Sequence, residues 1–190
     1  MEKQIKLLII LFMMTASCNQ EVVDEFKLTG AEIKEIDDLT TQYQKQSYLE
    51  SIFKSDQTIR EICAGLIVAN GLDSIEHKNC IRENNEIDAI NLLKIEYFLE
   101  KYGYPSKSVY GEIAAYTPFL IIHHSDSKEA RFRNFNYLNN AYHNQDIKES
   151  SFLLYLNRFY RMTYGKPFNK NTEVDEVSAL IDILELNEHM

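Results

Sequence analysis

Residues 47–71, SYLESIFKSDQTIREICAGLIVANG, repeat apolar side chains at intervals of three and four. That spacing places the apolar side chains on one face of an α-helix, and Gly71 follows as a helix stop would. The repeating positions are Leu49, Ile52, Phe53, Ile59, Ile62, Cys63 and Leu66. The stretch therefore predicts a long amphipathic helix with its apolar face buried.

The same period recurs along the rest of the chain. It predicts helices over 85–102, 110–123, 127–142, 151–164 and 174–184, with a turn or two of helix at 31–38. Gly103, Pro105 and Gly165 are helix stops. Pro118 predicts a kink within its helix, because proline lacks a backbone N–H. No long segment alternates apolar and polar residues as a β-strand does. We therefore predict an all-α fold, a single-domain bundle of about six helices.

Composition narrows the class of protein. The chain has 190 residues, of which 45% are hydrophobic, and contains only 6 Gly and 3 Pro. A chain of this size and composition folds as a globular domain and is neither collagen-like nor disordered. The formal net charge of −9 argues against nucleic acid as a partner. Glycine-rich phosphate loops and a complete set of metal ligands are missing from the pattern, so we expect no cofactor and no metal site.

The amino terminus has the pattern of an export signal. In order, it contains Lys3 and Lys6, an apolar run at 7–14, and then Ala16, Ser17 and Cys18. The apolar run is shorter than the ~20 residues of a membrane-spanning helix. We therefore interpret residues 1–17 as a signal peptide removed before Cys18, the alternative being an uncleaved amino-terminal anchor.

The stretch Thr15-Ala16-Ser17-Cys18 resembles a bacterial lipobox, with Thr15 in place of the usual Leu. The resemblance implies that Cys18 receives a diacylglycerol and becomes the acylated first residue. Two or three acyl chains, such as palmitate, hold a protein stably on a bilayer. The implied location is the bacterial cell envelope, on its periplasmic or surface face, with the membrane as one partner.

These features divide the chain into four parts. Residues 1–17 form the signal peptide, and 18–45 comprise the acylated cysteine, a tether and a first short helix. Residues 46–170 form the helical domain, and 171–190 contain an amphipathic helix packed on it.

Lipid on Cys18 would leave Cys63 and Cys80 as an even pair in a compartment where disulfides persist. The two either form a disulfide bond, or Cys63 packs as a buried free thiol on the apolar face of its helix. The spacing alone leaves both alternatives open.

Two pairs of polar residues fall at helical spacing. Asp56 and Arg60 are four apart, and Asp88 and Asn91 are three apart, so the members of each pair share a helix face. Taken alone, such pairs are typical of a solvated surface, where they contribute ~0.5 kcal/mol or less.

The sequence His123-His124-Ser125-Asp126 closes the most apolar of the expected helices. In one interpretation, a histidine here interacts with the negative end of the helix dipole and is purely structural. In the other, His124 is a catalytic base and Asp126 orients its ring. A metal site here would need further ligands, with Asp56 as the obvious donor.

Together these segments resemble an uncharacterised bacterial family whose members carry, in order, Asp-Gln-x-x-Arg, Asp-x-x-Asn, Gly-Trp-Pro, Gln-His-Ala-Asp and Asp-Arg. The likeness covers residues 49–168, with matches at Asp56, Gln57, Arg60, Asp88, Asn91, Gly103, Pro105, Gly111, His124, Asp126, Arg158 and Gly165. The departures are Tyr104 for Trp, His123 for Gln, Ser125 for Ala, Asn157 for Asp, and the missing Gln-x-Tyr-Gly-Thr-Gln tail. The resemblance implies that these polar residues converge, either as a satisfied network or as a pocket.

Two functions follow from these residues. The first is a lipid-anchored envelope protein that binds a partner, for which an acidic domain favours a basic protein. Its candidate binding residues are Asp56, Gln57, Arg60, Asn91 and Arg158. The second is a hydrolase-like enzyme in which His124 and Asp126 are catalytic and Asp56, Arg60 and Arg158 bind an anionic or polar substrate.

Overall fold

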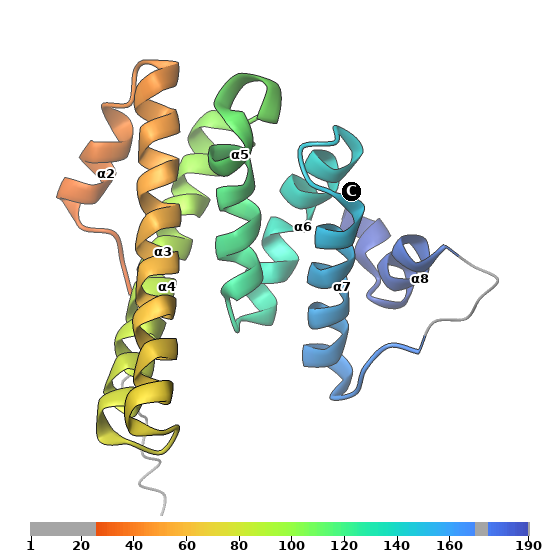
Figure 1. The fold of residues 1–190 in the computed structure, drawn as a ribbon. Helices are drawn as coiled ribbons and strands as arrows, with labels where there is room; N and C mark the ends of the chain where they lie inside the picture. The colour runs from red at the N-terminus through yellow and green to blue at the C-terminus, as the bar shows by residue number, and fades with distance from the viewer. Residues whose placement is uncertain (1–25, 170–174, 190) are drawn as a thin grey trace, which may run out of the picture.

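The computed structural model describes residues 26–169 and 175–189, and it confirms an all-α, single-domain bundle (Figure 1). The described residues contain seven α-helices and a short 3-10 helix. In chain order these are α2 Gly30–Asp37, α3 Gln42–Asn70, α4 Ile75–Tyr102, α5 Lys107–His124, α6 Lys128–His143, α7 Glu149–Tyr164, α8 Glu176–Ile183 and η1 Leu186–His189. The predicted signal peptide and Cys18 lie outside the described residues.

The two longest helices, α3 and α4, form an antiparallel hairpin (Figure 1). Thr41 and Gln44 form a reciprocal capping box at the start of α3, and Gly71, at a φ of 85°, ends the helix. Helix α4 starts ten residues before the expected 85, because the Ser74 side chain caps it by accepting from the His77 N–H. Its first turns are too polar to show the apolar period.

Helix α5 breaks at Gly111, seven residues before Pro118, where the sequence predicted a kink. Gly111 has a φ of 80° and a ψ of 173°, a conformation that essentially only glycine adopts. At Pro118 the Tyr104 hydroxyl enters the helix, donating to the Ala115 carbonyl at 2.8 Å and bonding the Phe119 backbone. Pro118 cannot donate to the Ala114 carbonyl, and the Tyr104 hydroxyl bonds the next carbonyl along the helix.

Helix α5 lies between the α3–α4 hairpin and the α6–α7 pair, with α2 on the far side of the hairpin and α8 beyond α7 (Figure 1). A single main core runs through this arrangement. Its largest fully buried apolar side chains include Tyr155, Phe98, Phe119, Phe135 and Phe152. Within the described ranges, no helix has both the length and the apolar character that crossing a bilayer requires.

Candidate functional site

Asp56 is the centre of a hydrogen-bonded cluster in the middle of α3. Its side chain is 0% exposed. It accepts from Gln57 Nε2 at 2.6 Å and from Arg60 Nη2 at 3.1 Å, so the helical spacing of Asp56 and Arg60 brings them into contact as expected.

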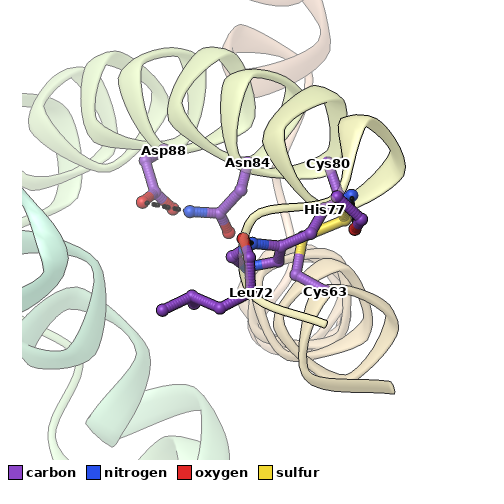
Figure 2. The surroundings of a disulfide bond; sticks show 7 residues. Cys63, Leu72, His77, Cys80, Asn84 and Asp88 are labelled. Carbon is purple, nitrogen blue, oxygen red and sulfur yellow. Dashed lines mark hydrogen bonds between the residues drawn. A yellow bond between two sulfur atoms is a disulfide. The ribbon is translucent and has the colours of Figure 1, made fainter. Parts of the chain in front are cut away.

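Arg60 joins this carboxylate to a second one on α4. Its Nη2 atom lies 2.7 and 2.8 Å from the two carboxylate oxygens of Asp88. Asn84, one turn before Asp88, donates to the same carboxylate at 3.2 Å (Figure 2). One guanidinium therefore bridges two carboxylates on neighbouring helices, an arrangement that favours Arg over Lys.

The end of α5 supplies the third side of the cluster. His124 Nδ1 lies 2.9 Å from Asp56 Oδ1. We call Asp56, Gln57, Arg60, Asp88 and His124 the Asp56 network. It connects α3, α4 and α5, and it unites polar residues that are 28 and 68 positions apart in the sequence.

Asp126 does not orient His124, which was the role expected from the sequence. Its carboxylate is 89% exposed and accepts from Arg158 Nη2 at 2.6 Å. Arg158 also donates to the His124 carbonyl at 3.4 Å. The carboxylate that contacts the His124 ring is Asp56, and Asp126 and Arg158 form a separate pair at the surface.

The two carboxylates of the network have opposite pKa shifts. Burial acts to raise the pKa of Asp56, but hydrogen bonds from His124 and Arg60 outweigh it and the pKa lies below its usual value. Burial also raises the pKa of Asp88, and there the attraction of Arg60 does not compensate. Asp56 is therefore the stable anion of the network.

Asn91 is buried on α4, and its Nδ2 atom has no hydrogen-bond partner among the described residues. It therefore donates nothing to the Asp56 network, although it lies one turn from Asp88. Of the candidate binding residues, Asp56, Gln57 and Arg60 thus come together, while Arg158 and Asn91 lie outside the network.

A residue that the sequence pattern did not single out holds the end of α5 in place. Arg131 of α6 is fully buried, and it donates to the carbonyls of Ser125, at 3.1 Å, and of His123. Its guanidinium lies 5.4 Å from the centre of the Tyr155 ring, and burial lowers its pKa to about 10. The sequence could have predicted its burial, because Arg131 lies one helical turn before Phe135 and therefore shares the inward face of its helix.

A pocket of about 220 Å³ lies between the end of α5 and α7. We call it the α5–α7 pocket, and its lining includes His123, Asn157, Arg158, Arg161 and Phe168. The buried Nδ1 of His123 has no hydrogen-bond partner within the described chain. Burial, together with Arg131 and Arg158, lowers the pKa of His123 to about 3, so the ring is neutral at physiological pH. Two arginines beside a neutral imidazole suit an anionic group.

Cys63 and Cys80 form a disulfide bond between α3 and α4, with Cα atoms 5.6 Å apart (Figure 2). With Ile59 they make a small second core, separate from the main one. The bond therefore holds together the part of the hairpin that extends beyond the main core.

Comparisons with known proteins give no match to this chain. No family model matches it, and neither a curated protein nor a solved structure does. In the described part of the chain, His, Cys, Asp and Glu side chains do not gather in a group of three or more that could hold a metal ion.

Proposed function

We propose that this protein is a lipoprotein of the bacterial cell envelope that binds a partner carrying an anionic group and is not a catalyst. The observation that carries the proposal is the pairing of the candidate catalytic side chains. His124 contacts the enclosed Asp56 carboxylate, and Asp126 pairs with Arg158. Groups held in this way specify helix packing, whereas the arginines of the α5–α7 pocket face space that a ligand can enter.

The chemistry of the pocket limits the ligand. Arg158 and Arg161 can form charge-assisted hydrogen bonds to a carboxylate or a phosphate, and a volume of about 220 Å³ admits such a group but not a large molecule. The formal charge of −9 opposes a highly anionic macromolecule at long range. A single acidic group on a neutral or basic partner meets both conditions.

Calorimetric titration with inorganic phosphate and with succinate tests the pocket. We expect weak binding that Arg161→Gln weakens about fivefold or more, because one charge-assisted contact is lost. Asp126→Asn should strengthen binding, because Asp126 competes for Arg158. Arg82→Gln, a change to an arginine exposed on the hairpin, is the matched control. Equal binding by all of these variants would contradict the proposal.

The envelope location is supported by the lipobox-like sequence before Cys18. We expect wild-type protein to stay with membranes after a high-salt wash and to carry acyl chains at Cys18 by mass spectrometry. Cys18→Ser should release it. An unmodified Cys18 in a chain that still begins at Met1 would overturn the location.

The contact between His124 and Asp56 favours the hydrolase-like alternative, because a buried carboxylate on Nδ1 orients an imidazole for proton transfer. Turnover of p-nitrophenyl acetate or p-nitrophenyl phosphate tests it. Activity that is lost in His124→Gln and kept in His143→Gln, a change to an exposed histidine, would favour the enzyme over the binding protein.

A further inference from the structure

The turn that joins α3 to α4 displays a concentration of exposed apolar side chains. We call residues 67–75 the hairpin tip. Within it, Ile67 is 39% exposed, Val68 88%, Leu72 62% and Ile75 65%. Turns are ordinarily polar, and apolar side chains that gather at the surface mark sites of contact.

The backbone of the hairpin tip is held in one conformation. The Gly71 N–H donates to the Ile67 carbonyl at 2.9 Å, and His77 Nδ1 lies 2.7 Å from the Leu72 carbonyl. The disulfide closes the hairpin behind the tip, and the Leu72 side chain points away from it (Figure 2). The exposed side chains are therefore presented by a rigid support.

The start of the described chain leads toward the same end of the molecule. Residues 26–29 run from the beginning of α2 along the hairpin in the direction of its turn (Figure 1). Seven residues, 19–25, separate Cys18 from Phe26, so the two residues lie at most about 29 Å apart when the chain is fully extended. A lipid on Cys18 could therefore reach that end of the hairpin.

The charges next to the apolar side chains nearly cancel. Asp73 and Glu76 lie beside Lys78, which leaves a formal charge of −1 next to the apolar side chains. A bilayer of zwitterionic lipid accepts an apolar, nearly neutral turn more readily than an acidic surface. End-on contact would keep the acidic body away from the headgroups.

We propose that the hairpin tip enters the interface of the bilayer to which Cys18 is attached, with Val68 and Leu72 leading, so that the domain stands end-on at the membrane. This inference rests on the proposed acylation of Cys18. It adds a second contact with lipid and gives the tethered domain a defined orientation.

The chain contains no tryptophan, so a single introduced one reports its own surroundings. The probes are Val68→Trp at the tip and Tyr43→Trp near the opposite end of α3, where Tyr43 is 76% exposed. Each full-length acylated protein is reconstituted in phosphatidylcholine vesicles containing lipid brominated in its acyl chains. We expect quenching at least about fivefold greater at position 68 than at position 43, because bromine quenches only indole that reaches the acyl region.

Vesicle flotation separates failure of the tip from failure of the anchor. Protein that floats with vesicles but shows no selective quenching at position 68 overturns the tip contact and leaves the anchor intact. A blue-shifted but unquenched signal from the Val68→Trp variant overturns it in favour of contact with a second copy of the chain. Equal quenching at both positions overturns the end-on orientation, and protein that does not float overturns the anchor and the inference that rests on it.

Discussion

Asp56 shows how much of this protein depends on one carboxylate. The side chain is removed from water, and Gln57, Arg60 and His124 supply its hydrogen bonds. A buried pair of this kind adds little net stability compared with apolar residues of similar size, but breaking it is costly. Its role is then to specify how α3, α4 and α5 meet.

Asp56→Ala should lower the free energy of unfolding by about 3 kcal/mol, because Arg60 and His124 each lose a buried acceptor. Asp126→Ala is the control. It removes an exposed partner of Arg158 and should cost about 1 kcal/mol or less. Urea unfolding measures both, and equal losses would show that the network has no special structural role.

His123 should make stability depend on pH. Burial, Arg131 and Arg158 lower its pKa to about 3 in the folded protein, against 6.5 for an ordinary histidine. As the pH falls from 6.5 toward 3, the unfolded chain binds a proton that the folded protein does not, so stability decreases. The contribution is at most about 1.4 kcal/mol per pH unit.

His123→Gln should remove this part of the pH dependence, whereas the exposed His143→Gln should not. Urea midpoints measured between about pH 7 and pH 5 test the difference. Parallel curves for His123→Gln and wild type would contradict the assignment.

At the scale of elements, two devices shape the long helices. The disulfide fastens the end of the α3–α4 hairpin, where the main core does not reach. Gly111 lets α5 turn near its start and then continue toward His124. Both features help to position the Asp56 network, because its hydrogen bonds join side chains of α3, α4 and α5.

Replacing both Cys63 and Cys80 with Ala should cost about 3 kcal/mol, since the bond closes a loop with a sequence separation of 17 in the unfolded chain. Denaturant unfolding in the Cys18→Ser background measures the loss. A reducing agent should destabilise the parent protein and leave the double variant unchanged. A double variant as stable as its parent would refute the contribution.

Gly111→Ala should cost about 1–3 kcal/mol, because its backbone conformation is strained for any residue with a Cβ. Space is not the cause, as the nearest heavy atom to an added Cβ is 4.0 Å away, on Gln46. Gly65→Ala, within α3 and in open space, should instead stabilise by about 0.5–1 kcal/mol. Thermal unfolding of the two variants should therefore shift in opposite directions.

At the scale of the whole molecule, the helices differ in how firmly they are held. Helix α3 packs against both α4 and α5, whereas α8 packs against α7 and continues into η1. The hairpin tip lies at the end of the two longest helices, α3 and α4, whereas the α5–α7 pocket is lined mainly by α7 and the residues that follow it. The net negative charge does not determine the fold, but it repels anionic macromolecules at long range.

Hydrogen exchange should follow this hierarchy. Amides of α3 near Leu49 and Ile52 should exchange only through global unfolding, and those of α8 near Leu180 should exchange through local opening at lower free energy. Exchange followed by mass spectrometry at peptide resolution measures both. Equal protection in α3 and α8 would show that the bundle opens only as one cooperative unit.

Much of the fold was predictable from local pattern. The apolar period located the helices, and Gly71, Gly103 and Gly165 ended them as expected. The start of α4 was missed because its first turns carry few apolar residues, and the break at Gly111 was missed because a single glycine does not interrupt the apolar period of α5.

The candidate site divides along the same line. The sequence by itself determined the helices and the contact of Asp56 with Arg60, because backbone geometry alone brings residues four apart together. Only the tertiary structure decided that His124 meets Asp56 across 68 residues and that Asp126 meets Arg158 across 32. Such distant pairs depend on how whole helices pack and on which buried groups must be satisfied, and spacing along the chain does not encode either.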